Sequence, residues 1–182
     1  MLQRKICMLG AFSVGKTSLV RRFVESAFSD TYLTTVGVKI DKKSVAIGER
    51  ALDLILWDIA GEDEVSTIRT SYLRGTAGYL LVADGTRELT LDVACSLHER
   101  VTGLLGDLPF VLLLNKCDLI DDWRVSDDRV AALRQAGWPV RPSSAKTGEG
   151  IEEAFRELAG RLPGTGRLPG TGLPEPSSPQ AP

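Results

Sequence analysis

The chain alternates between short apolar runs and segments with helical periodicity. Residues 5–10, 77–83 and 110–114 are largely continuous apolar runs, a pattern typical of strands that are buried on both faces. Segments 89–105 and 151–162 carry apolar residues three and four positions apart, which predicts amphipathic helices. The order of these segments predicts strands and helices that follow one another in turn.

A hairpin interrupts this alternation early in the chain. Residues 38–47 alternate between apolar and polar positions, residues 48–49 are a Gly-Glu turn signal, and residues 52–57 form a second apolar stretch. This pattern predicts two antiparallel strands. The preceding residues 28–37 are polar and lack a helical period, so we expect an exposed loop there.

The remaining segments complete an α/β fold. Helices are expected at residues 16–24 and, more weakly, at 65–74, and Ser126 or Asp127 caps a further helix. Val140 opens a short last strand. The sequence therefore predicts a six-stranded mixed sheet, with five parallel strands and one antiparallel strand, covered by helices on both faces. Ligands in such folds bind beyond the carboxyl ends of the strands.

The composition changes after Leu162. The run Arg-Leu-Pro-Gly-Thr-Gly occurs twice in tandem, and six of the nine prolines follow Leu162. A segment of this composition cannot bury a core. We predict one folded domain over residues 1–162 and a disordered Pro/Gly-rich tail over residues 163–182, which either stays solvated or serves as a ligand for a proline-recognising domain.

The overall composition is that of an ordinary globular protein. The chain has 182 residues, of which 43% are hydrophobic and 25% charged, with a net charge of -2. This charge gives no basis for a nucleic-acid partner. The three cysteines are widely spaced and predict reduced thiols in the cytoplasm. No run is long enough for a transmembrane helix, and the residues before the first strand are too few for a signal peptide.

Residues Gly10 to Thr17 match the phosphate-loop pattern G-x-x-x-x-G-K-[ST] in full. An expected strand precedes them and an expected helix follows, which is the context that the motif requires. Successive backbone N–H groups in such a loop, together with the positive end of the helix dipole, bind phosphate oxygens. Lys16 is expected to reach the β- and γ-phosphates. The hydroxyl of Thr17 is expected to bind Mg²⁺, an ion that prefers oxygen ligands.

Two further motifs are suited to recognising the base of a nucleotide bound at the phosphate loop. Asn115-Lys116-Cys117-Asp118 follows a predicted buried strand, at the same sheet edge as the phosphate loop. A carboxylate at Asp118 can accept hydrogen bonds from the two N–H donors of guanine, which adenine lacks. Ser144-Ala145-Lys146 is a plain turn when taken alone. Beside the other two motifs, it predicts a backbone N–H that donates to the guanine carbonyl oxygen.

With these motifs in order, the chain resembles a small GTPase of the Ras superfamily and is most similar to the Rab branch, over about residues 4 to 162. The fold that this resemblance implies is the G domain of the P-loop NTPases. The stretches that carry it are Gly10–Thr17, Thr35–Gly37, Trp57–Gly61, Ser71–Thr76, Asn115–Asp118 and Ser144–Lys146.

The resemblance implies a molecular switch that binds GTP or GDP with Mg²⁺ and hydrolyses GTP. It also implies an effector protein that binds through residues 32–45 and 59–76, an exchange factor and a GTPase activator. One alternative is a GTP-binding adaptor that does not cycle. A P-loop kinase or ATPase is a second alternative, against which Asp118 argues.

The resemblance also assigns roles to single residues. It implies a catalytic set of Lys16, Thr35, Gly61 and Glu62, and a Mg²⁺ set of Thr17, Thr35 and Asp58, the last acting through water. Phe28 is expected either against the guanine or in the core. The implied nucleotide-binding residues are Phe12, Ser13, Val14, Gly15, Lys16, Thr17, Ser18, Phe28, Tyr32, Thr35, Gly61, Asn115, Lys116, Asp118, Ser144, Ala145 and Lys146.

Several residues depart from the family pattern. Glu62 stands where the family usually has Gln, and an ionised Glu can only accept hydrogen bonds. Phe12 stands where the family has a small residue, and its bulk would crowd an arginine supplied by an activator. These two residues predict slow or unusual intrinsic hydrolysis, in which Glu62 either disfavours the attacking water or acts as a weak base, and no stimulation by a Ras-type activator. Lys39 and Ile40 replace an acidic residue and a Phe, which predicts an effector surface of its own.

Membrane anchoring by lipid is not expected from this sequence. No cysteine follows Cys117, and Leu2 occupies the position where myristoylation needs a glycine. We expect a cytoplasmic protein that a partner recruits to membranes.

Overall fold

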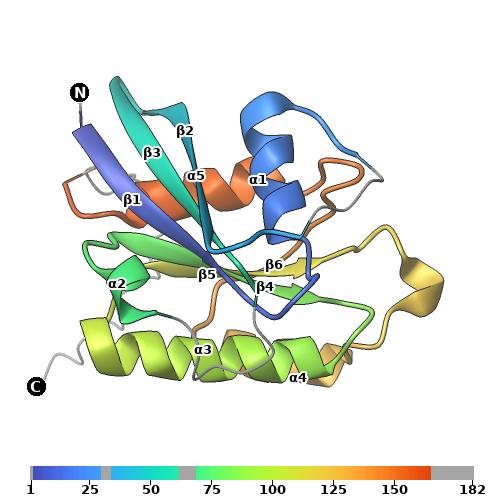
Figure 1. Cartoon of the computed structure of the whole chain (residues 1–182). Coiled ribbons are helices and arrows are strands. Elements are labelled where there is room, and N and C mark those ends of the chain that lie inside the picture. The colour runs from blue at the N-terminus through green and yellow to red at the C-terminus, as the bar shows by residue number, and fades with distance from the viewer. Residues whose placement is uncertain (1, 30–33, 62–68, 165–182) are drawn as a thin grey trace, which may run out of the picture.

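The computed structural model describes residues 2–29, 34–61 and 69–164. Figure 1 shows a central twisted sheet with helices on both sides. The elements are β1 (Leu2–Leu9), α1 (Lys16–Glu25), β2 (Val38–Ile47), β3 (Arg50–Ile59), α2 (Thr70–Leu73), β4 (Gly78–Asp84), α3 (Leu89–Leu105), β5 (Phe110–Asn115), the 3-10 helix η2 (Ile120–Asp122), α4 (Asp127–Gln135), β6 (Val140–Pro142) and α5 (Ile151–Arg161).

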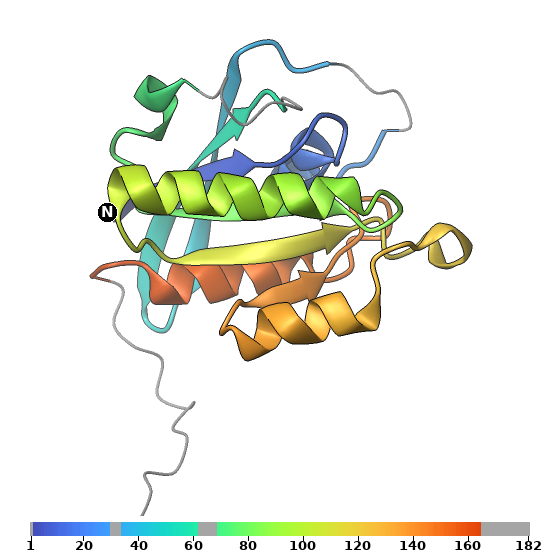
Figure 2. The same ribbon diagram turned by 90° about the horizontal axis from the view of Figure 1, so that it is seen from below.

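The sheet is the predicted six-stranded mixed sheet, in the order β2-β3-β1-β4-β5-β6. Only the hairpin partners β2 and β3 run antiparallel to each other, and the other neighbouring strands pair in parallel. The helices α1 and α5 pack on one face and α3 and α4 on the other. Figure 2 shows α3 lying along the second face. The predicted fold class is therefore confirmed.

The boundaries differ from the prediction where strands carry polar residues. β1 begins at Leu2 rather than at Lys5, and its first residues are exposed or half-buried. They pair with β3 from Leu2 opposite Leu52 onward. Because one face of this part of the sheet is open to solvent, the sequence there lacks the continuous apolar run that marks a buried strand. Of the expected helix at 65–74, the described residues form one turn, α2, and residues 62–68 lie outside the description.

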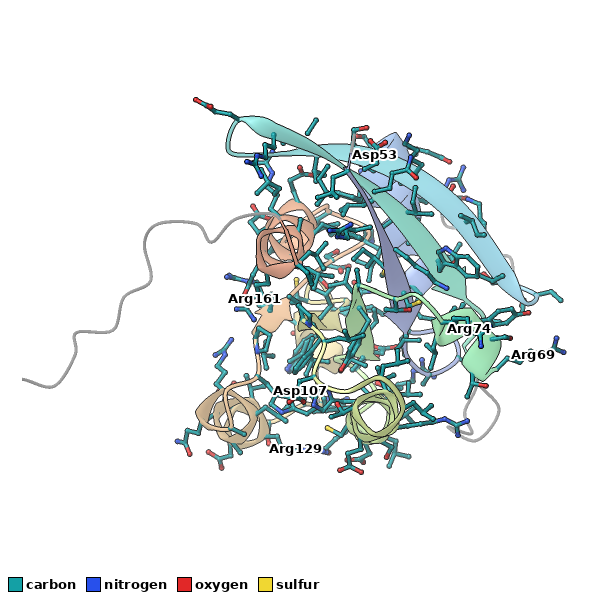
Figure 3. All side chains as sticks on the ribbon, turned by 90° about the vertical axis from the view of Figure 1, so that its left-hand side faces the viewer. Asp53, Arg69, Arg74, Asp107, Arg129 and Arg161 are labelled. Carbon is teal, nitrogen blue, oxygen red and sulfur yellow. The ribbon has the colours of Figure 1, made fainter. Side chains whose placement is uncertain are left out.

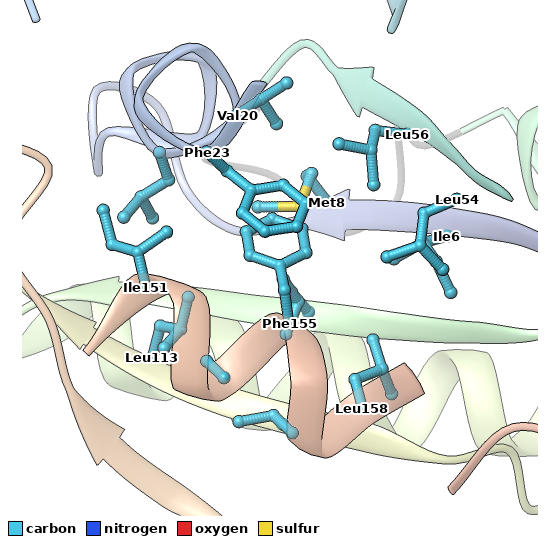
Figure 4. Close-up of a cluster of buried hydrophobic side chains, with 14 of the residues drawn as sticks. Ile6, Met8, Val20, Phe23, Leu54, Leu56, Leu113, Ile151, Phe155 and Leu158 are labelled. Atoms are coloured by element: carbon cyan, nitrogen blue, oxygen red, sulfur yellow. The ribbon is translucent and has the colours of Figure 1, made fainter. Parts of the chain in front are cut away.

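The core on the first face is organised by two stacked rings. Phe23 of α1 and Phe155 of α5 lie with their ring centroids 3.8 Å apart and their planes within 2° of parallel. Figure 4 shows the two rings stacked, with Met8 of β1 beside them. All three side chains are buried. This stack holds α1, and with it the loop before α1, against the sheet.

The second face joins α3 and α4 by charge and contains an aromatic cluster. Arg129 of α4 donates to Glu88 and Asp92 at the start of α3, at 3.2 and 2.6 Å, and Figure 3 shows it between the two helices. An aromatic cluster also lies on this face, further along α3. The Nδ1 atom of His98 lies 2.8 Å from the Tyr79 hydroxyl. The rings of Phe110 and Trp138 pack against this imidazole.

The described part of the chain ends shortly after α5. Leu162 is buried, and the carbonyl of Pro163 accepts hydrogen bonds from two nitrogens of the Arg4 guanidinium, at 3.1 and 2.8 Å. The rest of the predicted tail, residues 165–182, lies outside the described residues. In the part of the chain that is described, no helix has both the length and the apolar character required to span a bilayer.

Candidate functional site

The loop between β1 and α1 is built around the ammonium group of Lys16. The Lys16 Nζ donates to the carbonyl oxygens of Gly10 and Ala11, at 2.8 and 2.9 Å. Gly61, which follows β3 by two residues, lies against the same group, because a β-carbon there would stand 2.4 Å from Lys16 Nζ. The structure thus brings together three predicted residues of the phosphate end: the loop glycine Gly10, Lys16 and Gly61.

Three oxygen-bearing side chains converge beside this lysine. The Thr17 hydroxyl donates to Asp58 Oδ2 at 2.5 Å and lies 2.7 Å from the Thr35 hydroxyl, which itself is 3.5 Å from the same carboxylate oxygen. They come from the start of α1, from the end of β3 and from the segment before β2. Residues far apart in sequence therefore meet as one cluster.

This cluster fits a magnesium ion. Asp58 is fully buried, and its Oδ1 atom has no hydrogen-bond partner among the described residues. Burial raises the pKa of Asp58, which the Thr17 hydroxyl and the positive charges of Lys16 and Lys39 oppose. A buried carboxylate with an unpartnered oxygen, next to two hydroxyls, offers the hard oxygen ligands that Mg²⁺ prefers.

The base motifs meet the phosphate loop through Asn115. Its Nδ2 donates to the carbonyl of Val14 at 2.9 Å, and its Oδ1 accepts from the backbone N–H of Ala145 at 3.2 Å. Gly15 has a φ of +100°, and a β-carbon there would lie 2.3 Å from Asn115 Nδ2, so the loop needs a glycine at this point. One buried amide therefore joins the phosphate loop to both base loops.

Asp118 and Ser144 hold the two base loops together. The Ser144 hydroxyl donates to Asp118 Oδ1 at 2.6 Å. The backbone N–H of Cys117 donates to the Ser143 carbonyl at 3.0 Å. The carboxylate of Asp118 is thus fixed in direction before any ligand arrives.

A cavity of about 430 Å³ opens between the phosphate loop, α1 and the segment before β2. Among the predicted site residues, its wall contains Phe12, Ser13, Gly15, Lys16, Thr17, Ser18, Phe28, Thr35 and Gly61. Val14, Asp58, Asn115, Lys116, Asp118, Ser144, Ala145 and Lys146 are not part of this wall. Asn115 nevertheless touches the cavity's floor at Gly15, so the base loops adjoin the cavity rather than line it.

The two aromatic candidates occupy different positions in the cavity. Phe12 is 45% exposed and lines the side near α3, where its carbonyl accepts from the Arg87 guanidinium at 2.9 Å. Phe28 is half-buried, lines the cavity and packs against the first core. Phe28 therefore combines a position on the cavity wall with packing against the core. Tyr32 and Glu62 lie outside the described residues.

Two charged groups behind the site were not predicted. Asp84, at the end of β4, is fully buried and binds Lys116 Nζ at 2.6 Å and Arg87 Nε at 2.9 Å. Burial opposes ionisation of Asp84, but hydrogen bonds from Lys116, Thr86 and Arg87 outweigh it and lower its pKa. An acidic residue that ends a buried strand at the ligand edge was the available signal for Asp84.

Arg22 is the second unpredicted group. From α1, its guanidinium donates to the carbonyls of Ala145, at 2.9 Å, and of Lys146. The Arg22 guanidinium carbon also lies 5.9 Å from the centre of the Phe28 ring. Nothing in the helical pattern of α1 distinguishes Arg22 from its neighbour Arg21, so the sequence carried no signal for this contact.

Comparison with known proteins gives consistent matches over the folded part. A family model described as the Ras family matches residues 5–163. The chain is 34% identical to human "Ras-related protein Rab-8B" over 157 residues, which cover 85% of this chain and 76% of that protein. It is 36% identical to "Ras-related protein SEC4" of Saccharomyces cerevisiae over 156 residues, or 85% and 73% of the two chains. Bovine "Ras-related protein Rab-3C" is 32% identical over 156 residues, with 85% and 69% covered.

Proposed function

This chain belongs to the Ras family, and we propose that the cavity between the phosphate loop and Thr35 is where it carries out the chemistry of that family. The protein is a Rab-like guanine-nucleotide switch, which binds GTP or GDP with Mg²⁺ and hydrolyses GTP to GDP and phosphate. We assign the parts of this activity to three groups of residues, at the phosphate end, the metal end and the base end of the site.

The phosphate end of the site rests on Lys16 and Gly61. The Lys16 ammonium donates hydrogen bonds to two carbonyl oxygens of the loop, and the Gly61 backbone lies beside it. We assign Lys16 to the β- and γ-phosphates and the Gly61 backbone N–H to the γ-phosphate, where charge must be stabilised as the bond to the leaving oxygen breaks. We assign to Glu62 the orientation of the water that attacks the phosphorus.

The metal end rests on Thr17, Thr35 and Asp58. These residues would hold Mg²⁺, which when bound neutralises charge on the β- and γ-phosphate oxygens. Thr35 leads directly into β2, so its contact with Thr17 would be the point at which the state of the nucleotide reaches the switch segment.

The base end rests on Asp118, with Ser144, Ala145 and Lys146 beside it. The observation that carries the proposal is the double contact of Asn115 with Val14 and Ala145. It fixes the phosphate loop and the base loops at one separation. A single guanine nucleotide can then be held at both ends.

Exchanging the base preference tests this assignment. In Asp118→Asn, the amide offers a donor to the base, so the variant should bind xanthosine diphosphate in preference to guanosine diphosphate, with GDP affinity reduced by about 100-fold or more. Fluorescent GDP and XDP titrations at saturating Mg²⁺ measure both affinities. Asp121→Asn is the matched control, since Asp121 is exposed in the neighbouring 3-10 helix. An unchanged preference in Asp118→Asn would refute the site.

Members of the family act through effectors, exchange factors and GTPase activators. We assign effector binding in this chain to residues 32–45 and 59–76. Val36 is 91% exposed and Ile40 is 52% exposed, and Ile40 pairs in register with the half-buried Trp57 on the open face of the sheet. Exposed apolar side chains next to the cavity are suited to a partner that senses the nucleotide.

We also propose a folded domain over residues 1–162 and a cytoplasmic location with recruitment to membranes by a partner. Leu162 packs against Gly78 and closes the apolar face of α5, which supports the domain boundary. The cysteines Cys7, Cys95 and Cys117 are all free thiols, as expected in a reducing compartment.

A further inference from the structure

Lys39 places a positive charge beside the metal ligands. In the antiparallel pair of β2 and β3, Lys39 lies directly opposite Asp58. Residues that face each other in this way project from the same side of the sheet. Lys39 also lines the cavity together with Thr17 and Thr35. A lysine on the wall of the phosphate cavity therefore shares its side of the sheet with the buried carboxylate.

A counter-charge accompanies this lysine. The Lys39 Nζ lies 3.2 Å from Asp41 Oδ2, and Asp41 is two residues along the same strand, on the same face. The Lys39 side chain is 49% exposed and that of Asp41 is 16% exposed. The cation and the anion thus form a pair on the same face of the sheet as Asp58, in which the lysine is half-exposed and the carboxylate mostly buried.

Other charges near the site have different roles. Lys16 is committed to the phosphate loop, while Arg21 and Glu25 of α1 line the cavity and pair with each other at 3.1 Å. Lys42 is also on β2, but it points to the opposite, open face and pairs with Asp53 at 2.7 Å. Lys39 is therefore the charge on β2 that the strand register aligns with a metal ligand.

We propose that Lys39 lowers the affinity of the site for Mg²⁺ and thereby sets how readily bound nucleotide is released, while Asp41 partly offsets it. The inference rests on the proposed site. A positive charge near Asp58 makes the electrostatic potential at the metal position less negative, and a dication feels that change twice over. Mg²⁺ held by Thr17, Thr35 and Asp58 would neutralise charge on the bound phosphates, so a weaker metal site should lose its nucleotide while the concentration of free Mg²⁺ is still higher.

The test is the Mg²⁺ dependence of nucleotide release. The full chain is loaded with fluorescent GDP, and the release rate is followed in Mg²⁺/EDTA buffers to find the free Mg²⁺ concentration that gives half-maximal retention. Lys39→Gln should lower this midpoint by roughly three- to tenfold, and Asp41→Asn should raise it. Lys39→Arg keeps the charge and should keep the wild-type midpoint. The differences should shrink at about 0.5 M KCl, because exposed charges are screened.

Lys42→Gln is the matched control, since it removes the same charge from the same strand on the opposite face. Its midpoint should equal that of the wild type. A midpoint in Lys39→Gln that stays within about twofold of the wild type, or that shifts only as much as in Lys42→Gln, would overturn the inference while leaving the site intact. Failure of the wild-type chain to bind GDP at saturating Mg²⁺ would overturn the proposed site and this inference with it.

Discussion

The side-chain amide of Asn115 donates a hydrogen bond to the backbone carbonyl of Val14, 101 residues earlier in the chain. Both groups are buried, and the amide oxygen of Asn115 is at the same time an acceptor for Ala145. A single side chain thus determines the spacing between the two ends of the nucleotide site.

Asn115→Ala should accelerate GDP release by about tenfold or more, because a buried carbonyl and a buried N–H would lose their partners and the loops could move apart. Stopped-flow release of fluorescent GDP measures this effect. Asn115→Asp keeps an acceptor for Ala145 but places a buried carboxylate against the Val14 carbonyl, so it should accelerate GDP release at least as much as Asn115→Ala. A release rate like that of the wild type in Asn115→Ala would show that the loops are held by other contacts.

Hydrolysis should respond to the two residues that depart from the family pattern. Phe12 is half-exposed on the cavity wall, where we expect its bulk to crowd an arginine supplied by an activator, and Glu62 can accept but not donate when ionised. We expect the Phe12→Gly, Glu62→Gln double variant to hydrolyse GTP about tenfold faster or more in single-turnover assays. Each single variant serves as a control for the other, and unchanged rates in all three would contradict the expectation.

The stacked rings of Phe23 and Phe155 should dominate the stability of the first face. Phe155 is fully buried, so Phe155→Ala leaves a cavity and should reduce the free energy of unfolding by about 3–5 kcal/mol. Urea denaturation of the GDP-loaded protein measures this loss. Leu104→Ala, on the exposed side of α3, is the control and should change stability by about 0.5 kcal/mol or less. Equal losses in both variants would argue against the stack as the main contact.

Stability should fall in acid partly because of His98. Burial lowers the pKa of His98 from its ordinary 6.5, while Asp107 and Glu99 oppose that change. Burial raises the pKa of Tyr79 to about 12, so its hydroxyl keeps its proton and can donate to Nδ1 of the neutral ring. The unfolded chain then binds the proton more readily than the folded one, and stability is lost as the pH falls through 6.5 towards the folded pKa.

Thermal unfolding at about pH 7.5 and about pH 5.5 measures this dependence. His98→Gln cannot be protonated and can still accept a hydrogen bond from Tyr79, so its melting temperature should drop less between these two pH values than that of the wild type. Equal drops in both proteins would assign the acid sensitivity to groups other than His98.

The elements that the sequence predicted well are those determined by local burial. Residues 110–114 form an apolar run because β5 is covered on both faces, and α3 spans the residues 89–105 that its spacing predicted. The phosphate loop was also predictable, because other atoms approach its glycines so closely that a β-carbon would not fit there. At Gly15 the close contact is with Asn115.

What the sequence could not provide are contacts created by the topology. Asp84 meets Lys116, and Arg22 meets Ala145, only because β4, β5 and β6 end at the same edge of the sheet and α1 begins there. The charge of Lys39 could be recognised as unusual from its position, but its alignment with Asp58 follows from the register of the hairpin. An arginine on a polar helix face or a lysine in a strand has no local pattern that distinguishes such a role from solvation.

The order of the strands has a mechanical consequence for the switch. Because β2 is the outermost strand of the described sheet, on the side opposite β6, it is hydrogen-bonded along a single side, to β3. The segment that carries Thr35 runs straight into this margin. The Thr35 segment can therefore move toward or away from the nucleotide while the hydrogen bonds between the inner strands stay intact. The gain or loss of one phosphate group can then change the conformation at the edge of the sheet without disturbing its centre.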